Sequence, residues 1–341
     1  MTERIVILAP NWLGDAVMAL PAIGDVRRYC PEAHLAVAAR RSVAPVFTMV
    51  AGVDEVVTLP GGGGLRALTG WRDDARVLAD GKFGTALLLP NSFATAFTTA
   101  KALIAERWGF ATDRRAAWLT RAIPRPGEAV HQRAYYQALT TALGMPAGQP
   151  FARVHPDRDR TRALLKEIGL DPDEPYVVFA PGAAYGGAKQ WLPQRFAELA
   201  ATIIGDRGWS VLMVGTAADR PACEQISARM PKTGTRMNRL IDLSGKSDLP
   251  SLAGILAEAR AVVSNDSGAM HLAGAVGTKV VAVFGPTRET HTYPLAAGPD
   301  APTPTVITHD VFCRPCMLRE CPIDHRCMTR ITAREVFEHL I

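Results

Sequence analysis

Short apolar runs alternate along this chain with longer segments in which apolar residues recur at helical spacing. The short runs are typical of buried strands, and the longer segments are typical of amphipathic helices. Regular alternation of the two favours an α/β protein whose parallel sheets are covered by helices on both faces. Strands are predicted at 5–9, 35–39, 55–59, 85–89, 176–180, 210–214, 261–264 and 280–284, and helices at 16–29, 94–105, 135–143, 160–168, 193–207 and 249–259.

The segment 145–157 interrupts this alternation with prolines at 146, 150 and 156. We expect a linker there, which divides the chain into doubly wound, Rossmann-like domains of residues 1–156 and 157–341. Both halves open alike, with a strand ending in Ala-Pro, a glycine-containing loop and a helix. Ligands of such sheets bind beyond the carboxyl ends of the strands, so two facing domains would enclose a cleft bordered by these loops.

Composition narrows the class of protein. The chain has 341 residues, 48% hydrophobic and 21% charged, which predicts a soluble globular protein with more than one core. No apolar run is long enough to span a membrane. The first residues lack a secretory core and a cleavage site, so we expect a cytoplasmic protein.

The net charge of +5 is carried entirely by the first 160 residues. This distribution suits an anionic partner or a membrane surface. A bias toward arginine is the alternative explanation, since most of the basic residues are arginine. Binding of nucleic acid is disfavoured, because the basic residues form no stripe interleaved with aromatic residues and no known module.

The sequence A-V-V-S-N-D-S-G-A-M-H at 261–271 places a polar turn between a predicted strand and a helix rich in small residues. A helix N-terminus carries unpaired N–H groups and a partial positive charge, and it can therefore bind phosphate. Ser267 and Gly268 fit that role, since glycine lets an anion approach the backbone closely. An ordinary N-cap formed by Asp266 or Ser267 is the alternative.

A second loop, P-G-A-A-Y-G-G-A-K-Q-W at 181–191, follows the predicted strand 176–180. Its glycines would let backbone N–H groups face a ligand, and Lys189 adds a compact positive charge. The spacing is not that of a P-loop, but the loop could hold a diphosphate. A solvated lysine in a flexible loop is the alternative. Of the six tryptophans, only Trp12 and Trp191 are expected in loops that face the cleft.

The first loop, N-W-L-G-D at 11–15, presents an acid at the start of a helix. A carboxylate there would repel phosphate, but it could remove a proton from a hydroxyl group. The alternative interpretation of Asp15 is again a helix N-cap.

Four motifs in order carry a family resemblance: N-W-L-G-D at 11–15, L-P-N-S-F at 89–93, P-G-A-x-x-G-x-A-K-x-W at 181–191 and S-N-D-S-G-x-M-H-L-A at 264–273. With them, the chain resembles the ADP-heptose:lipopolysaccharide heptosyltransferases of glycosyltransferase family nine, and in particular the heptosyltransferase II branch. The resemblance extends over essentially the whole sequence.

The resemblance implies a GT-B architecture, two facing Rossmann-like domains with the active site between them, and inverting transfer of heptose without a bound metal. It implies that Asp15 is the general base and that Lys189 neutralises the ADP leaving group. An N-terminal acceptor-binding domain would precede a C-terminal ADP-sugar-binding domain. Donor-binding residues would be Gly182, Gly187, Gly215, Thr216, Gly245, Asp266, Ser267, Gly268, Ala269 and His271, and acceptor-side residues would be Asn11, Trp12, Gly14 and Asn91.

The implied partners are ADP-heptose and the inner core of lipopolysaccharide, the Kdo/heptose region on lipid A, with peripheral contact to the inner membrane surface. The carboxylates and phosphates of such an acceptor would account for the positive N-terminal half. Its densest basic cluster is Arg107, Arg114, Arg115, Arg121 and Arg125. The alternatives are a family-nine transferase acting on another glycan or a protein, and a non-catalytic nucleotide-sugar-binding protein.

The C-terminal tail, residues 309–330, is rich in cysteine. Cys313, Cys316, Cys321 and Cys327 have the spacing C-x2-C-x4-C-x5-C, with His309 and His325 nearby. In a cytosolic protein this spacing favours a metal over disulfides. For a metal, a structural Zn²⁺ is the first expectation and an iron–sulfur cluster the second, and reduced thiols that pack a C-terminal hairpin are the evenly weighted alternative to both. No cofactor is expected for catalysis.

Overall fold

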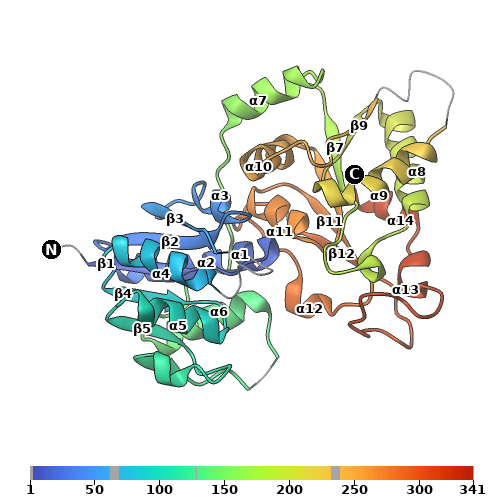
Figure 1. The fold of residues 1–341 in the computed structure, drawn as a ribbon. Coiled ribbons are helices and arrows are strands. Elements are labelled where there is room, and N and C mark those ends of the chain that lie inside the picture. The colour runs from blue at the N-terminus through green and yellow to red at the C-terminus, as the bar shows by residue number, and fades with distance from the viewer. Residues whose placement is uncertain (1–2, 62–68, 128, 232–238, 341) are drawn as a thin grey trace. The chain divides into compact units, whose positions relative to one another are not determined.

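The computed structural model describes residues 3–61, 69–127, 129–231 and 239–340. It divides into two compact units, Met1–Ala152 and Arg153–Ile341. Among the described residues, each unit contains a six-stranded sheet in which all neighbouring strands are parallel. This confirms the predicted α/β class (Figure 1).

The first sheet has the order β3-β2-β1-β4-β5-β6. Its helices pack in pairs, α2 with α6 and α4 with α5. Its strands are β1 (Arg4–Leu8), β2 (His34–Arg40), β3 (Glu55–Leu59), β4 (Thr85–Leu88), β5 (Glu106–Phe110) and β6 (Arg121–Ile123). Its helices are α1 (Leu13–Met18), α2 (Leu20–Tyr29), α3 (Ala44–Phe47), α4 (Gly70–Asp80), α5 (Phe93–Lys101) and α6 (Gln132–Ala142).

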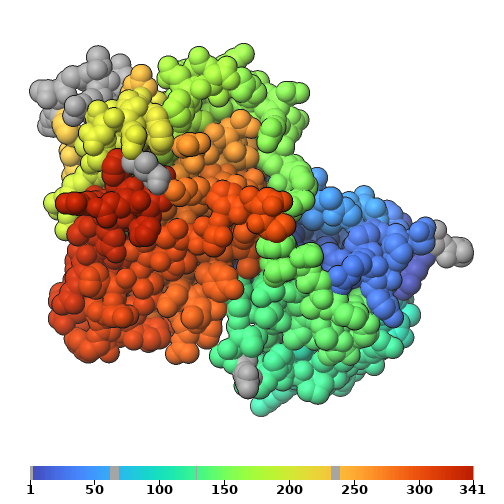
Figure 2. Space-filling view, turned by 180° about the vertical axis from the view of Figure 1, so that it is seen from behind, coloured from blue at the N-terminus to red at the C-terminus, as the bar shows by residue number. Residues whose placement is uncertain are grey.

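The second sheet has the order β12-β11-β10-β7-β8-β9. The C-terminal helix α14 packs against α8, and the C-terminal residues form a continuous surface in the space-filling view (Figure 2). The strands are β7 (Tyr176–Ala180), β8 (Ser210–Met213), β9 (Leu240–Asp242), β10 (Ala261–Asn265), β11 (Val280–Phe284) and β12 (Thr305–Thr308). The helices are α7 (Arg158–Glu167), α8 (Pro193–Thr202), α9 (Arg220–Ala228), α10 (Leu249–Glu258), α11 (Gly268–Ala275), α12 (Glu289–Thr292), α13 (Arg326–Thr329) and α14 (Ala333–Leu340).

Both sheets are buried on two faces, as the apolar runs predict. Alternate residues of a strand point to opposite faces. Val6 and Leu8 of β1 pack with Leu78 of α4 in one core cluster. Ile5 and Ile7, on the other face, are just as buried. Parallel strands covered on both faces therefore read as continuous apolar runs rather than as alternating ones.

The prediction of a single helix at 16–29 is wrong in one respect. The segment forms two helices that meet at Ala19, which follows the end of α1 and precedes the start of α2. Pro21 stands in the first turn of α2. Because proline has no backbone N–H, it cannot continue the hydrogen-bond ladder of α1, whereas it is well tolerated at a helix start.

Candidate functional site

The strand order of each sheet reverses at one point, between β1 and β4 in the first unit and between β7 and β10 in the second. Such a switch point opens a crevice at the carboxyl ends of its two strands, where ligands of doubly wound sheets bind. The four motif loops all follow these strands: 11–15 after β1, 89–93 after β4, 181–191 after β7, and 266–268 after β10.

In the second unit, two of the predicted donor residues form an ion pair. Lys189 Nζ lies 2.6 Å from Asp266 Oδ2, and the two side chains are 14% and 6% exposed. Thr287 Oγ1 donates a 2.6 Å hydrogen bond to the same oxygen. Lys189 is therefore not the solvated lysine of the alternative interpretation. An ammonium group has three N–H donors, so one bond to Asp266 leaves donors for a phosphate.

Asn265, which sequence reasoning missed, holds both ends of the loop 181–191. Its Oδ1 accepts from the backbone N–H of Trp191 at 2.9 Å, and its Nδ2 donates to the carbonyl of Pro181 at 2.7 Å. The side chain is fully buried. A polar residue directly after an apolar run was the available signal, because a buried amide requires partners.

The placement of Trp191 in a cleft-facing loop is wrong. Its side chain is 1% exposed, packs on Phe196, and donates from Nε1 to the carbonyl of Ile331 at 3.0 Å. Trp191 therefore anchors the end of the loop in the core of the second unit. Trp12 is 66% exposed.

The helix α11 begins at the predicted anion site. Ser267 occupies the N-cap position in extended conformation, but its side chain makes no capping hydrogen bond. Its hydroxyl instead lies 3.1 Å from that of Ser264. The first-turn N–H groups of Gly268 and Ala269 are thus not capped by Ser267, whereas His271 lies buried one turn further along.

The glycines of the second unit serve close contacts within the protein. A Cβ on Gly182 would lie 2.1 Å from Asp219 Oδ1, and one on Gly215 would lie 2.9 Å from the same side chain. Gly245 has a φ of 71° and donates to the Gly215 carbonyl at 2.9 Å. The Asp219 carboxylate also accepts from the N–H and hydroxyl of Thr216, both at 2.8 Å. The predicted adenosine-side residues are therefore brought together beside Gly182.

Gly187 lies apart from this group. Its N–H donates to Glu320 Oε1 at 3.2 Å rather than facing an open site. At its neighbour Gly186, a Cβ would lie 2.4 Å from the carbonyl oxygen of Arg319. Glycine at this position is thus explained by the close approach of the C-terminal tail.

In the first unit, Asp15 lies in the first turn of α1, and the N-cap is Trp12, without a side-chain capping bond. The N-cap interpretation of Asp15 is therefore wrong. The phenol of Tyr136 on α6 donates to Asp15 Oδ1 at 3.4 Å. Burial raises the pKa of Tyr136 well above its usual value, and the charge of Asp15 raises it further. The phenol thus stays a donor to this carboxylate at neutral pH.

Asn91 follows β4 and belongs to the same edge of the sheet. Its Nδ2 donates to the phenol oxygen of Tyr135 at 2.8 Å, so consecutive tyrosines of α6 contact the loops after β1 and β4. Of the other acceptor-side residues, Asn11 is exposed and Gly14 lies half-buried in the first turn of α1.

Arg115 does not belong to the exposed basic cluster in which the sequence places it. It is fully buried, and it donates to the carbonyls of Phe110 at 2.9 Å and of Pro90. Burial lowers the pKa of its guanidinium to about 10. Arg115 therefore fixes the loop after β4 from within the protein and is not available to an acceptor.

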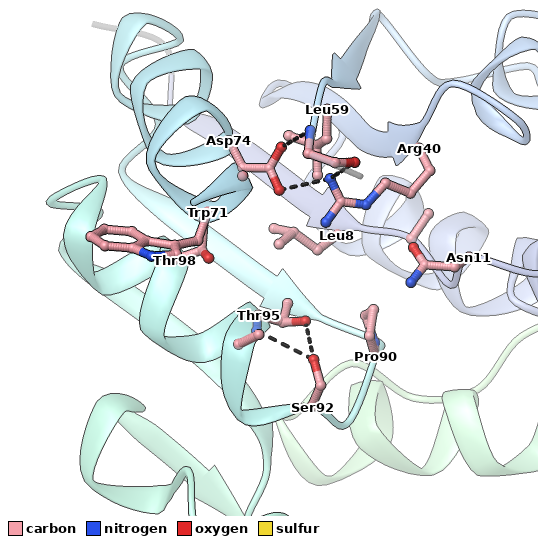
Figure 3. A pocket seen from close by; sticks show the side chains of 14 residues that line it. Leu8, Asn11, Arg40, Leu59, Trp71, Asp74, Pro90, Ser92, Thr95 and Thr98 are labelled. Carbon is pink, nitrogen blue, oxygen red and sulfur yellow. Dashed lines mark hydrogen bonds and ion pairs between the residues drawn. The ribbon is translucent and has the colours of Figure 1, made fainter. Parts of the chain in front are cut away.

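A cavity of about 210 Å³ opens at the carboxyl ends of the first sheet. Arg40 Nη1 donates there to Asp74 Oδ2 at 2.7 Å and to the Gly61 carbonyl at 2.8 Å (Figure 3). The hydroxyls of Ser92 and Thr95 lie 2.7 Å apart on the opposite wall. The lining residues are Leu8, Ala9, Asn11, Arg40, Leu59, Gly61, Gly70, Trp71, Asp74, Pro90, Ser92, Ala94, Thr95 and Thr98.

The structure does not support the predicted Zn²⁺ site. Among the described residues, which include all four tail cysteines, no group of three or more His, Cys, Asp or Glu could hold a metal ion. Cys327 is buried in the core, whereas Cys316 is exposed. Burial, and then the neighbouring Cys313, Cys321 and Cys316, raise the pKa of the Cys327 thiol. All four are free thiols.

Comparisons with known proteins agree with this architecture. The sequence model of glycosyltransferase family 9 (heptosyltransferase) matches residues 71–326. The lipooligosaccharide heptosyltransferase 2 of Haemophilus influenzae is 30% identical over 304 residues, 86% of each chain. The lipopolysaccharide heptosyltransferase 2 of Escherichia coli is 28% identical over 301 residues, again 86% of each chain.

A solved structure, that of the Escherichia coli ADP-heptose LPS heptosyltransferase II, superposes with a TM-score of 0.83 at 26% identity. The alignment covers 99% of this chain and 97% of that one, which confirms the predicted GT-B class of fold. In the described part of the chain, no helix has the length and apolar character needed to cross a membrane. The chain is a glycosyltransferase and belongs to family 9, the heptosyltransferase family.

Proposed function

We propose that this enzyme transfers L-glycero-D-manno-heptose from ADP-heptose to a sugar hydroxyl of the lipopolysaccharide inner core, with inversion at the anomeric carbon. The names of its relatives support the donor and the acceptor class. The observation that carries the proposal is the lysine–carboxylate pair, Lys189 with Asp266, beside the start of α11 at the switch point of the second sheet.

The C-terminal unit would bind the donor. When the bond between the anomeric carbon and the phosphate oxygen breaks, negative charge develops on ADP. The Lys189 ammonium and the first-turn N–H groups of Gly268 and Ala269 can stabilise that charge without a divalent ion. Asp266 holds the ammonium in place and can also receive heptose hydroxyls. We assign Gly182, Gly215, Thr216 and Gly245 to the adenosine side, with Gly187 and His271 supporting the loop and the helix.

The N-terminal unit would bind the acceptor, with Asp15 as the general base. Asp15 would take the proton of the attacking hydroxyl while its oxygen bonds to the anomeric carbon and ADP leaves. The hydrogen bond from the Tyr136 phenol would orient the Asp15 carboxylate for this role. Asn11 and Trp12 precede α1, Gly14 lies in its first turn, and Asn91 follows β4; these residues would contact the acceptor.

The cavity beside Asn11 is our candidate for one sugar of the acceptor. Its volume of about 210 Å³ suits a single ring rather than a long oligosaccharide. Ser92, Thr95 and the Arg40 guanidinium offer donors for hydroxyl groups, and the Asp74 carboxylate balances the charge of Arg40. We infer that the positive excess of the N-terminal half directs the enzyme to anionic lipid at the cytoplasmic face of the inner membrane.

The test is release of ADP from ADP-heptose in the presence of truncated lipopolysaccharide acceptors. The proposal requires release that depends on a Kdo or heptose-terminated core. It also requires that Asp15→Asn lose about two to four decades of kcat while its affinity for ADP stays unchanged. Release with another glycan or a protein alone would instead establish a different acceptor. Full turnover of the Asp15→Asn variant would remove the general base from the proposal.

A further inference from the structure

The Cys-rich segment 313–327 contacts the Lys189 loop directly. The Ala188 N–H donates to the carbonyl of Arg319 at 2.9 Å, and His325 Nε2 donates to the Ala188 carbonyl at 2.7 Å. The Tyr185 hydroxyl donates to the carbonyl of Met317 at 2.8 Å. Both backbone groups of the residue that precedes Lys189 are therefore bound by this segment.

The same segment also holds the loop that supports Asp266. Arg314 Nε donates to the Gly285 carbonyl at 2.6 Å, and its Nη2 donates to the Thr287 carbonyl at 3.1 Å. Arg314 further pairs with Glu289 at 2.5 Å, and its side chain is only 8% exposed. Thr287 is the residue whose hydroxyl donates to Asp266. Arg314 thus fixes the backbone of Thr287, the residue that bonds to the Asp266 carboxylate.

We propose that segment 313–327 is a clamp that sets the geometry of Lys189 and Asp266 for the donor diphosphate, with Arg314 and His325 as positioning residues. This inference rests on the proposed donor site. Among the hydrogen bonds and ion pairs of the described residues, none joins this segment to the Lys189 ammonium or the Asp266 carboxylate. It acts on the backbone next to Lys189 and on the backbone of Thr287, whose hydroxyl bonds to Asp266, and so determines where the ammonium and the carboxylate lie before ADP-heptose binds.

The local backbone explains why these residues suit the role. His325 has a left-handed conformation, with φ of 55° and ψ of 31°, which turns the chain back toward the loop. Its own N–H donates to Cys321 Sγ at 3.3 Å, so the turn is tied to the cysteine segment. A loop held in its binding conformation loses less entropy when a ligand binds, and preorganised charge stabilises a leaving group more effectively than mobile charge.

The experiment compares His325→Asn and Arg314→Met with wild type. Asparagine tolerates the left-handed backbone but is too short to reach the Ala188 carbonyl. Loss of one or two such hydrogen bonds predicts ADP binding weaker by about three- to tenfold in calorimetry, with an equal rise in the KM for donor. The KM for acceptor should stay unchanged. Arg326→Met is the matched control in the same segment, because Arg326 bonds to Asp324 rather than to a donor loop.

The outcomes separate the clamp from the donor site itself. If Lys189→Met weakens ADP binding while His325→Asn and Arg314→Met bind as wild type does, the clamp is wrong and the donor site stands. If wild type and Lys189→Met bind ADP equally, the donor assignment fails, and the clamp with it. A parallel rise of both KM values that follows a lowered melting temperature would show a purely structural role and overturn the clamp.

Discussion

The ammonium nitrogen of Lys189 lies 2.6 Å from Asp266 Oδ2, although 77 residues separate the two side chains in the sequence. Removing one member of a buried pair leaves the other charge without compensation, whereas removing both does not. We expect Lys189→Met to lower the free energy of unfolding by about 3 kcal/mol, and Lys189→Met/Asp266→Asn to recover at least about 1 kcal/mol of it.

Urea denaturation of the two variants and of wild type measures this coupling. Gln194→Met, at a position that bonds only within its own helix in the described structure, is the control for the substitution itself. Equal destabilisation of the single and the double variant would contradict a paired arrangement.

The hydrogen bond from the Tyr136 phenol to Asp15 gives a second prediction. Tyr136→Phe keeps the buried ring and removes only the donor, so kcat should fall by about three- to tenfold with little change in melting temperature. Burial and the Asp15 charge raise the pKa of Tyr136, so its proton is retained as pH rises. The loss of kcat in Tyr136→Phe should therefore be the same at pH 7 and pH 9.

Steady-state rates at the two pH values provide the measurement. Tyr29→Phe makes the same chemical change at a side chain on α2 that is largely exposed, and it should leave kcat as in wild type. A Tyr136→Phe enzyme with wild-type kcat at both pH values would show that the phenol does not support the base.

The inner strands other than β5 could be predicted because burial on two faces leaves an apolar run in the sequence, and the edge strand β3 was predicted as well. The strands β5, β6, β9 and β12 were missed. β5 begins Glu-Arg although it lies between β4 and β6, and β6 and β9 have three residues each. β6, β9 and β12 are edge strands with one bonded neighbour, so their composition can resemble that of a loop. Helices α4 and α9 were missed as well.

The site was predictable as a set of loops but not as a set of contacts. Strand–turn–helix patterns indicated the loops that hold Asp15, Lys189 and Ser267, because ligand loops follow parallel strands, whereas the roles of Asp15 and Asp266 were implied by the family resemblance. The pairing of Lys189 with Asp266 depends on strand order, which local sequence does not encode. For the same reason Trp191 could be mistaken for a ligand contact: nothing within the loop reveals that it packs against α8 and the C-terminal chain.

Asp25 is a buried carboxylate that joins three parts of the first unit. It is 2% exposed and accepts from Gln137 Nε2 at 2.9 Å, from the Gly148 N–H at 2.7 Å and from Arg28 Nη2 at 3.1 Å. Asp25→Ala would leave these donors without their acceptor in a dry environment. We expect a loss of about 2–3 kcal/mol in the free energy of unfolding.

Chemical denaturation followed by circular dichroism checks this value. Asp73→Ala, at a side chain that is 60% exposed on α4, should change stability by less than about 0.5 kcal/mol. An Asp25→Ala protein as stable as the control would mean that solvent or a local shift satisfies the donors.

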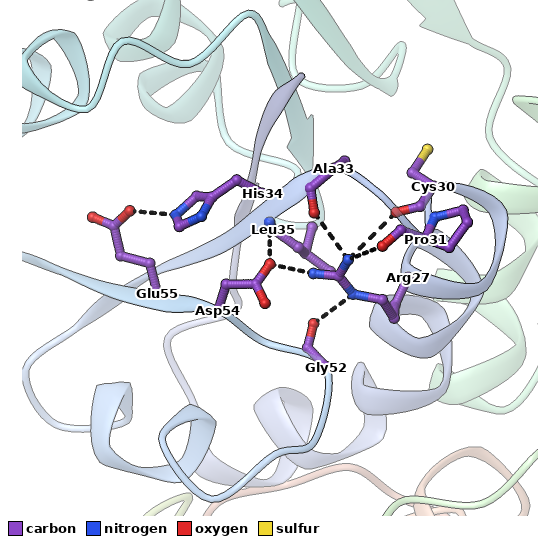
Figure 4. A network of polar contacts seen from close by, with 9 residues as sticks. All are labelled: Arg27, Cys30, Pro31, Ala33, His34, Leu35, Gly52, Asp54 and Glu55. Atoms are coloured by element: carbon purple, nitrogen blue, oxygen red, sulfur yellow. Dashed lines mark hydrogen bonds and ion pairs between the residues drawn. The ribbon is translucent and has the colours of Figure 1, made fainter. Parts of the chain in front are cut away.

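The contacts of Asp54 predict how the free energy of unfolding depends on pH. Its Oδ2 accepts from the Leu35 N–H at 2.8 Å and from the Arg27 guanidinium, which also donates to carbonyls of the 30–33 turn and of Gly52 (Figure 4). The backbone hydrogen bond from Leu35, followed by the bond from Arg27, lowers the pKa of Asp54 below its usual value.

A carboxyl group whose pKa is lower in the folded state adds stability above its unfolded pKa, about 3.9 for aspartate, and loses it as pH falls through the folded value. The free energy of unfolding of Asp54→Asn should therefore be lower than that of wild type by a constant amount above about pH 5, and this difference should disappear as pH falls below about 4.

Urea unfolding in steps from pH 6 to pH 2.5 measures the free energy of unfolding of both proteins. Asp80→Asn is the control, because Asp80 is exposed and has no such bonds among the described contacts. Its free energy of unfolding should change with pH as that of wild type does. A gap between Asp54→Asn and wild type that keeps its size down to pH 2.5 would show that ionised Asp54 does not stabilise the fold.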